Sequence, residues 1–359
     1  MWIKSDEVLI TGATGFIGGR IAERLWIDCG IISRCLVRNF SNAARLARLP
    51  VRRYPGDLLD RPSVERAMGD CKVVFHCAYG NTDDLHLNRR INEEGTKNIG
   101  EIALRNGVKR FVYISSVAVY GSNQPEEVNE KTSVRFSDDE YGNSKIKAEE
   151  VCADLLNQGL PVVIVRPTVV FGPFSPIWTV GAIKRVLIGG WEDVEGVNGL
   201  CNSVYVDDLV DGLLLSVKFD RAVGETFIVS GEPPITWNEF FGVYIQLAGL
   251  SEPSEISGGK RKLKSILSNL LRGNINLFRR FFEPQLMDFY LFMKQKSPHF
   301  TRKLDGLIRG GIKEDEVNRF SQKTIYSIDK ARSTLGYSPR SFEEGMRITA
   351  DWLRHHEYI

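Results

Sequence analysis

The sequence has no cysteine or histidine arrangement typical of a disulfide-rich or zinc-binding protein. Its six cysteines contain no C-x-x-C pair, and its five histidines are scattered, apart from the neighbours His355 and His356. A disulfide framework needs paired cysteines at short spacings, and a structural zinc site needs four clustered ligands. Because neither pattern is present, we expect reduced, mostly buried thiols and no metal site.

The sequence also has little excess charge, no leader-like start and no long apolar run. Lysine and arginine total 47 against 45 acidic residues, a net charge of +2, which removes any global electrostatic argument for nucleic-acid binding. Residues 1–7 lead directly into a predicted strand, without the pattern of a signal peptide, so we expect a cytoplasmic protein. No uninterrupted apolar stretch reaches the roughly 18 residues of a spanning helix, so we expect no transmembrane segment.

What the sequence does contain is a glycine-rich motif between Val8 and Gly19. A short apolar run precedes glycines spaced by three, and an apolar helical pattern follows, which is typical of a strand, a tight turn and a helix facing a phosphate. Gly12 permits the turn, Gly15 lets the backbone approach a pyrophosphate, and Gly18 allows the helix to pack closely on the strand. The residues that we expect to contact a dinucleotide are Gly12, Thr14, Gly15, Phe16, Ile17 and Gly18.

Arg38 ends the second predicted strand, 32–37, where a dinucleotide-binding fold meets the adenosine ribose. An acidic residue at this point would accept the 2′-hydroxyl of NAD, whereas an arginine pairs with the 2′-phosphate of NADP. Arg38 therefore favours NADP(H), with NAD(H) as the alternative. Two further arginines, Arg45 and Arg48, either add positive charge here or form a solvated helix face.

Two more predicted strand ends supply candidate cofactor contacts. Asp57 and Leu58 follow the third strand at the expected adenine edge, where Asp57 is also a candidate N-cap of a turn. After the fourth strand, 72–76, the chain reads Cys77, Ala78 and Tyr79, of which Tyr79 is either a core residue or a substrate contact.

The predicted helix 85–105 has polar residues where an ordinary amphipathic helix would be apolar. Asn92 and the run 95–98 lie toward the expected sheet-facing side. We therefore expect Asn92 to contribute to the cofactor site.

A serine, a tyrosine and a lysine form the candidate catalytic set. Ser116 lies at the carboxyl end of the fifth strand, 111–114, and ligands bind at that end of an open parallel sheet. Tyr141 and Lys145 are four residues apart and share one helix face. A phenol with a pKa of about 10 transfers protons poorly at neutral pH unless a nearby cation favours its phenolate, and Lys145 is expected to be that cation.

Taken together, these motifs resemble the extended short-chain dehydrogenases/reductases, within the NAD-dependent epimerase/dehydratase family and its dihydroflavonol-reductase-like branch. The matching residues are T-G-x-x-G-x-x-G from Thr11, Asp57-Leu58, Ser116, Tyr141 with Lys145, Arg166-Pro167, Val206-Asp207-Asp208, and the run from Lys330 to Tyr337. The resemblance implies an α/β fold with a Rossmann-type doubly wound parallel sheet and a smaller, mostly helical C-terminal substrate lobe.

The resemblance also implies residue roles. Tyr141 would be the general acid/base, Lys145 would lower its pKa and hold the nicotinamide ribose, and Ser116 would orient the substrate oxygen, with Ser115 as the neighbouring alternative. Further cofactor contacts would be Pro167 and Val170. The residues expected beside the substrate are Tyr79, Ser116, Val117 and Thr168.

Departures from the subfamily patterns narrow the range of possible substrates. Sugar-nucleotide 4,6-dehydratases resembling this chain have Asp-Glu after the catalytic hydroxyl residue, where this chain has Val117 and Ala118. Nucleotide-sugar enzymes often have an asparagine and an arginine that contact the diphosphate, where this chain has Val169 and Cys201. These differences disfavour a 4,6-dehydratase and weaken the case for a nucleotide-sugar substrate.

We expect two lobes. Residues 1–172 with 201–231 would bind the cofactor, and residues 173–200 with 232–359 would bind the substrate. The second lobe includes a basic, aromatic amphipathic insertion at about 259–309, which is either a lid over the cleft, a subunit contact or, through 259–300, a peripheral membrane contact.

Three functions remain open on this reading. The first is an NADP(H)-dependent oxidoreductase acting on a secondary alcohol or ketone, and the second is a nucleotide-sugar 4-epimerase with tightly bound NAD. The third, a cofactor-binding protein without chemistry, is disfavoured because Ser116, Tyr141 and Lys145 are all retained. The resemblance implies a homodimer formed through the helices that contain 92–105 and 141–156. The expected ligand is a small molecule and not a nucleic acid.

Overall fold

In the computed structural model the chain divides into two compact units. The first comprises Met1–Phe171, Asn202–Pro233 and Ile325–Gly345, and the second comprises Gly172–Cys201, Pro234–Thr324 and Met346–Ile359. The structure describes residues 5, 7–122, 124–188, 191, 197–251 and 314–359. The expected insertion at 259–309 therefore lies outside the described residues.

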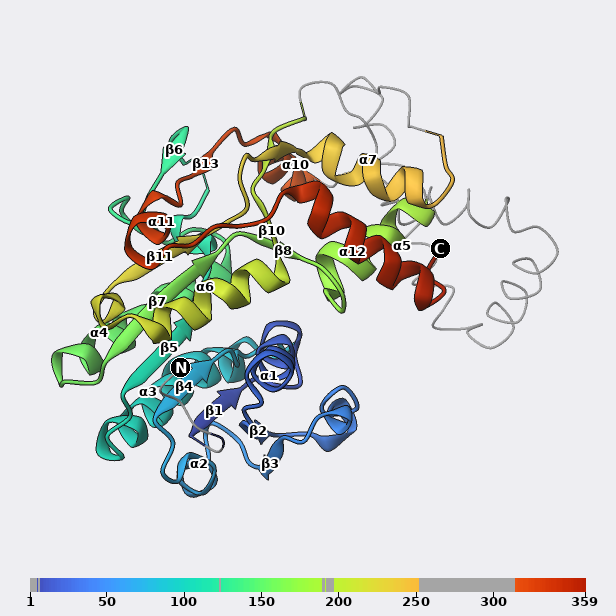
Figure 1. Cartoon of the computed structure of the whole chain (residues 1–359). Helices are drawn as coiled ribbons and strands as arrows, with labels where there is room; N and C mark the ends of the chain where they lie inside the picture. Colours follow the sequence, from blue (N-terminus) through green and yellow to red (C-terminus); the bar gives the residue numbers. More distant parts are fainter. Residues whose placement is uncertain (1–4, 6, 123, 189–190, 192–196, 252–313) are drawn as a thin grey trace, which may run out of the picture. The chain divides into compact units, whose positions relative to one another are not determined.

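A seven-stranded sheet in which all neighbouring strands are parallel forms the centre of the first unit (Figure 1). In spatial order the strands are β11 (Thr226–Val229), β7 (Val162–Pro167), β5 (Arg110–Ile114), β4 (Val73–His76), β1 (Val8–Thr11), β2 (Arg34–Val37) and β3 (Arg52–Pro55). The order reverses direction at β1 and β4, the place where a doubly wound sheet binds its ligand. The Rossmann-type fold expected from the sequence is confirmed.

Helices cover both faces of this sheet (Figure 1). One face carries α2 (Arg61–Met68), α3 (Leu85–Arg105) and α4 (Glu140–Asn157). The other face carries α1 (Phe16–Cys29), α6 (Val206–Lys218) and α11 (Asp329–Leu335). Because both faces are covered, the central strands are mostly apolar and do not alternate with polar residues; polar residues such as Thr11 in β1 and His76 in β4 lie at strand ends.

The core lies between the sheet and each helix layer. On the side of α3 and α4, Leu9 and Phe111 from the strands pack with Ile99 and Leu155 from the helices, all buried. Alternate strand residues face the opposite layer. A Cβ added to Gly100 of α3 would lie 2.2 Å from Leu155 Cδ1, so the glycine allows α3 and α4 to approach closely.

The helix ends follow from local side chains. Asp84 begins α3 by accepting a hydrogen bond from Leu87 N at 3.0 Å, and Asp139 begins α4 by accepting one from Tyr141 N at 3.2 Å. By contrast, Gly15 begins α1 with no side-chain cap. The first amides of α1 therefore lack the side-chain partner that α3 and α4 have.

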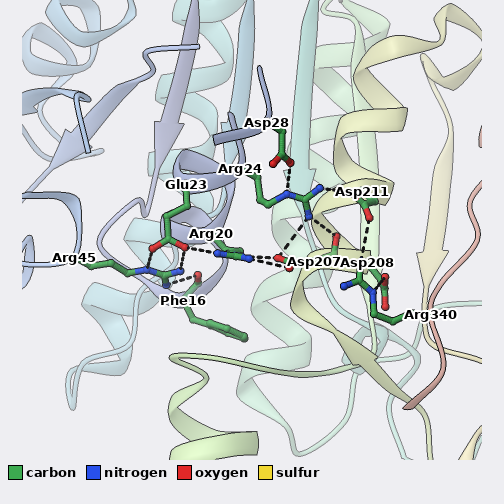
Figure 2. A network of polar contacts seen from close by, with 10 residues as sticks. All are labelled: Phe16, Arg20, Glu23, Arg24, Asp28, Arg45, Asp207, Asp208, Asp211 and Arg340. Atoms are coloured by element: carbon green, nitrogen blue, oxygen red, sulfur yellow. Dashed lines mark hydrogen bonds and ion pairs between the residues drawn. The ribbon is translucent and has the colours of Figure 1, made fainter. Parts of the chain in front are cut away.

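Ion pairs tie α1 to neighbouring elements of the first unit (Figure 2). The Arg20 guanidinium donates to both carboxylate oxygens of Asp207, with distances of 2.5 and 2.8 Å. On its other side, Arg20 contacts Glu23 at 2.9 Å. The network in Figure 2 comprises Phe16, Arg20, Glu23, Arg24, Asp28, Arg45, Asp207, Asp208, Asp211 and Arg340.

Two short pairings complete the first unit. They join β8 (Val169–Phe171) to β10 (Ser203–Tyr205) and β6 (Glu127–Val128) to β13 (Ile325–Tyr326). Four short 3-10 turns also belong to it, namely η1 (Phe40–Asn42), η2 (Leu46–Arg48), η3 (Val117–Tyr120) and η5 (Asp220–Ala222). Because of the β6–β13 pairing, Ile325–Gly345 belongs to this unit, whereas the expected division assigns it to the substrate lobe.

The described part of the second unit is mainly helical and rich in aromatic residues. Its elements are η4 (Pro176–Gly181), α5 (Ala182–Leu187), β9 (Leu200–Cys201), β12 (Ile235–Thr236), α7 (Trp237–Leu247), α10 (Glu314–Ser321) and most of α12 (Phe342–His355). Trp191 stacks on Phe241 at 3.9 Å between centroids, and Phe320 packs edge-on against Trp237 at 4.8 Å. No helix among the described residues is long and apolar enough to span a membrane.

Candidate active site

The glycine turn between β1 and α1 forms a close-packed cradle. Gly12 has a φ of +69°, and a Cβ there would lie 2.7 Å from Ala78 N. A Cβ on Gly18 would lie 2.5 Å from the carbonyl oxygen of Gly12. Gly15 is exposed in front of the uncapped start of α1. These features fit a dinucleotide pyrophosphate, because its oxygens need unpaired amides and a backbone surface free of side chains.

The other residues expected at this turn occupy positions consistent with a ligand surface. Thr14, Phe16 and Ile17 are partly exposed around the start of α1, whereas Gly18 is buried between helix and strand. The structure therefore separates ligand-facing positions from the packing position in the motif.

A buried histidine lies directly behind the turn. His76 Nδ1 is 2.7 Å from Thr11 Oγ1, and its Nε2 is 3.0 Å from Thr96 Oγ1. Thr96 donates its proton to the carbonyl oxygen of Asn92, so it accepts from His76 Nε2–H, and His76 Nδ1 accepts from Thr11. Burial lowers the pKa of His76 to about 3, with the Lys145 charge adding to the effect, so the imidazole is neutral at physiological pH.

The unusual polar residues of α3 are used to hold neighbouring loops. The Asn92 side-chain oxygen accepts from Gly80 N at 2.7 Å, and Asn98 donates to the carbonyl oxygen of Leu58 at 3.0 Å. Leu58 is buried, and a Cβ on Gly95 would lie 2.9 Å from Leu58 Cβ. In the structure Asn92 and Asn98 hold the loops at Gly80 and Leu58. Direct contact of Asn92 or Leu58 with the cofactor stays a prediction.

At the end of β2, Arg38 is exposed and lies near Asp57. The closest atoms of the two side chains, Arg38 Nη1 and Asp57 Oδ2, are 4.0 Å apart, and 61% of the arginine side chain is exposed. The other Asp57 oxygen accepts from Leu59 N at 2.9 Å, which is the turn-capping arrangement. Both roles considered for Asp57 are therefore sterically compatible.

Arg45 does not belong to a solvated helix face. Its Nε and Nη2 donate to the Glu23 carboxylate, each at 2.6 Å, and its Nη1 donates to the Phe16 carbonyl oxygen at 3.2 Å. The segment is a short 3-10 turn in which Arg48 is exposed. Arg45 is thus engaged by α1, whereas Arg38 is exposed at the end of β2.

The two neighbouring serines at the end of β5 have different surroundings. Ser115 is 1% exposed, and its hydroxyl donates to Glu149 at 2.5 Å. Ser116 is partly exposed, begins η3 by accepting from Ala118 N at 3.1 Å, and acts to lower the pKa of Tyr141. Ser116 is therefore the serine that lies beside Tyr141.

Lys145 is buried one helical turn beyond Tyr141. Its ammonium donates to the carbonyl oxygen of Ile114 at 2.8 Å and lies 5.8 Å from the Tyr141 ring centroid. It also lies 5.0 Å from the ring of Tyr113 and 5.4 Å from that of Tyr79. Burial lowers the pKa of Lys145 to about 8, although the nearby Cys77, Glu149 and Cys152 oppose this effect.

The expected lowering of the Tyr141 pKa is wrong for the protein alone. Tyr141 keeps 40% of its surface exposed, yet burial of its hydroxyl raises the pKa of Tyr141 to about 12, and the Ser116 side chain only partly opposes this. Lys145 does not offset this effect, and its ammonium donates to the carbonyl oxygen of Ile114. The phenol is therefore protonated at neutral pH.

The remaining candidate residues lie around this centre. Tyr79 is 43% exposed and packs edge-on against Tyr141, with 5.8 Å between ring centroids. Thr168 is partly exposed, and its hydroxyl donates to Ser230 at 3.0 Å. The others are Cys77, Ala78 and Val117, which are partly exposed, and Pro167 and Val170, which are buried.

Two buried groups near the site, His76 and Glu149, lie outside the sequence motifs. His76 ends β4 immediately before the expected cofactor residues, and Glu149 follows Lys145 by four residues on the same face of α4. Helical spacing from Lys145 is the sequence signal that points to Glu149. For His76 no periodic signal exists, because its partners Thr11 and Thr96 come from distant segments.

Comparisons with known proteins agree with this geometry. A family model described as the NAD dependent epimerase/dehydratase family matches residues 8–230. A UDP-glucose 4-epimerase from Vibrio cholerae is 30% identical over 62% of this chain and 70% of its own length. A 2-alkyl-3-oxoalkanoate reductase from Shewanella oneidensis is 25% identical over 96% of this chain and 85% of its own.

The fold also occurs in solved structures. The crystal structure of a UDP-glucose 4-epimerase from Thermotoga maritima superposes with a TM-score of 0.70, covering 98% of this chain and 99% of that one, at 21% identity. A likeness at this level of identity shows the shared fold. The relatives include both epimerases and a reductase, so the family alone does not distinguish these activities.

Proposed function

Since the chain belongs to the NAD-dependent epimerase/dehydratase family, we propose that it is an oxidoreductase that interconverts a ketone and a secondary alcohol, using NADP(H) in preference to NAD(H). The observation that carries the proposal is the convergence of Ser116, Tyr141 and Lys145 at the carboxyl end of β5, opposite the glycine cradle. This combination offers a proton donor, an oxygen-orienting hydroxyl and a buried cation in one place.

Each of these side chains has one task in the proposed reaction. Ser116 donates a hydrogen bond to the substrate oxygen and keeps it near the Tyr141 hydroxyl. Tyr141 gives its proton to that oxygen during ketone reduction and takes it back during alcohol oxidation. The raised pKa of Tyr141 supports the reductive direction, because the phenol already holds its proton at neutral pH.

The cofactor would be held along the carboxyl edge of the sheet. The amides of Phe16 and Ile17, at the uncapped start of α1, would receive the pyrophosphate. Arg38 would pair with a 2′-phosphate, and Lys145 would hold the nicotinamide ribose. When bound, the dinucleotide supplies or accepts the hydride. Arg38 supports NADP(H) because its side chain is exposed at the ribose position, whereas Arg45 is engaged by Glu23.

The side chains around Ser116 and Tyr141 favour reduction of a ketone over 4,6-dehydration of a sugar nucleotide. Val117 and Ala118 follow Ser116 directly, and Tyr79 presents a half-exposed ring next to the phenol. Neither Val117 nor Ala118 has a group that can move a proton at a sugar carbon. The nearly full-length likeness to an oxoalkanoate reductase supports the same substrate class.

The central test is replacement of Tyr141 by phenylalanine. With NADPH and a panel of aliphatic, aromatic and cyclic ketones, we expect Tyr141→Phe to lower kcat by about 100-fold or more, because the proton donor is lost. NADPH binding, followed by nicotinamide fluorescence, should change by less than about twofold. The control is Tyr54→Phe, the same change on β3; a Tyr141→Phe enzyme with the wild-type rate would rule out the proposed acid/base.

The alternative function is a nucleotide-sugar 4-epimerase with tightly bound NAD. The likeness to the Vibrio cholerae UDP-glucose 4-epimerase favours it, whereas Val169 and Cys201, which replace diphosphate-contacting residues, oppose it. An epimerase retains NAD through purification and shows no net turnover of added NADPH. Analysis of the nucleotide released on denaturation, together with NADPH consumption, separates the two functions.

A further inference from the structure

Behind the candidate active site lies a buried ion pair that the proposed chemistry does not use. The Glu149 carboxylate receives two hydrogen bonds from Arg166, Nε to Oε1 at 2.9 Å and Nη2 to Oε2 at 2.5 Å. Both residues are at most 9% exposed. The Ser115 hydroxyl donates to the same carboxylate at 2.5 Å, one residue before Ser116.

Arg166 also reaches the far end of the turn that begins at Ser116. Its Nη1 donates to the Tyr120 hydroxyl at 2.8 Å, and that hydroxyl in turn donates to the carbonyl oxygen of Asn129 at 3.1 Å. The turn η3 runs from Val117 to Tyr120. The Glu149–Arg166 pair therefore holds this turn at both ends, through Ser115 on one side and Tyr120 on the other.

Stability alone does not account for a buried pair of this kind. Desolvating two charges costs about as much free energy as their attraction returns, and well-packed apolar residues often replace such pairs without loss. What apolar residues cannot do is fix two hydroxyl groups by charge-assisted hydrogen bonds of defined direction. The pair therefore serves to position these two hydroxyl groups. Through Ser115 it also fixes the position of the neighbouring Ser116.

Glu149 also shares one face of α4 with the two candidate catalytic residues of that helix. Tyr141, Lys145 and Glu149 follow each other at intervals of four residues. The Glu149 charge opposes the lowering of the Lys145 pKa that burial causes. A neutral residue at this position would affect both the turn that carries Ser116 and the cation beside Tyr141.

We propose that Glu149 is a positioning residue: together with Arg166, it clamps the Ser115–Tyr120 segment so that the Ser116 hydroxyl stays in register with the Tyr141 hydroxyl. The clamp itself is a property of the folded chain. Its effect on turnover rests on the proposed oxidoreductase function, so the two are measured separately.

The first experiment measures the clamp without any substrate. Amide hydrogen exchange is followed by mass spectrometry in wild type, Glu149→Gln and the control Glu150→Gln, which makes the same change at the next, exposed position of α4. In Glu149→Gln the η3 amides, which are bonded to Ser116 Oγ and to backbone oxygens of the turn, should exchange about 10-fold faster. Exchange in the sheet strands should not change.

Ser115→Ala, a smaller perturbation of the same contact, should accelerate exchange in the same turn. Unchanged exchange at η3 in both Glu149→Gln and Ser115→Ala would overturn the clamp. Faster exchange throughout the sheet in both variants would also overturn it, because the role would then be general stability.

The second experiment uses the ketone found active in the Tyr141 test. Glu149→Gln should lower kcat by about 10- to 100-fold, with little change in KM for NADPH, because small displacements at a reacting centre cost this much. In a Ser116→Ala background the same substitution should lower kcat by less than about threefold, because the part of its effect that acts through that hydroxyl is already lost and only the effect on Lys145 is left. If the losses in kcat caused by Glu149→Gln and Ser116→Ala were additive, Glu149 would not act by positioning Ser116. If the Tyr141 test failed, the proposed function would be wrong, but the hydrogen-exchange measurement would still test the clamp.

Discussion

Arg38 and Arg45 show how environment decides what an arginine can bind. They lie seven residues apart, but Arg45 has two of its nitrogens on Glu23, while 61% of the Arg38 side chain is exposed. Its nearest acidic group, Asp57, is 4.0 Å away and only weakly coupled to it at that distance and exposure. A 2′-phosphate would therefore compete with little besides water and Asp57 for Arg38.

We expect Arg38→Ala to weaken NADPH binding by about 10-fold or more while changing NADH binding by less than about threefold, because only NADPH has the phosphate that Arg38 would pair with. Fluorescence titration with each nucleotide measures both values. Arg48→Ala, an exposed arginine on η2, is the matched control. Equal losses for NADPH and NADH would contradict the role of Arg38.

The tyrosine and lysine of the site show a limit of reasoning from spacing. Four-residue spacing correctly predicts that Tyr141 and Lys145 share a helix face, because helical periodicity is a local property. It does not predict where the ammonium points, since its partner, the Ile114 carbonyl oxygen, comes from β5. The direction of the Tyr141 pKa shift could therefore not be predicted without the tertiary structure.

At the scale of elements, α1 is fixed to α6 by the Arg20–Asp207 pair. Asp207 lies in the first turn of α6, where a carboxylate also complements the helix dipole. Burial raises the pKa of Asp207, but the hydrogen bonds and charge of Arg20 outweigh it, so the net shift is downward. The neighbouring Asp208 differs: burial raises its pKa to about 6 despite contact with Arg340.

Asp207→Asn is expected to lower the free energy of unfolding at pH 7 by about 2 to 3 kcal/mol, because Arg20 would lose its bidentate partner in a mostly buried position. Urea denaturation measures this value. Asp28→Asn, which removes an exposed partner of Arg24, is the control and should cost less than about 1 kcal/mol.

The pH dependence of this prediction has a definite sign. A carboxyl group whose folded pKa is lowered stabilises the fold above its unfolded pKa, near 3.8, and loses that contribution as the pH falls through the lower, folded value. The difference in stability between wild type and Asp207→Asn should therefore be constant from pH 7 to 5 and shrink below about pH 4. A difference that grows toward low pH would contradict the assignment.

At the scale of the molecule, the expected homodimer through α3 and α4 stays a prediction. The outward faces of these helices are polar: Arg89 pairs with Glu140 at 3.0 Å, and Lys147 pairs with Glu150 at 2.8 Å, all with exposed side chains. An interface built from such a surface would depend on charge more than on apolar burial.

We therefore expect a dimer in low salt that dissociates in about 1 M salt, where screening confines charge interactions to about 3 Å. Size-exclusion chromatography with light scattering at several protein concentrations measures this. A dimer that persists at high salt would indicate a different, apolar interface, and a monomer under all conditions would refute the dimer.

The segment 259–300 lies outside the described residues, so its role as lid, subunit contact or membrane contact stays open to experiment. Co-sedimentation with vesicles containing anionic lipid, compared with neutral vesicles, addresses the membrane alternative. Binding to anionic vesicles alone would support peripheral contact, and absence of binding would favour a lid or a subunit contact.

The sheet, the glycine turn and the Tyr141–Lys145 pair can be predicted from the amino-acid sequence, because strands, tight turns and helix faces depend on neighbouring residues along the chain. Long-range contacts place Ser116 beside Tyr141 while Ser115 binds Glu149, and they bring Glu23 to Arg45. The tertiary structure also determines that burial, and not Lys145, sets the Tyr141 pKa. These outcomes depend on partners that the fold brings together from distant parts of the chain.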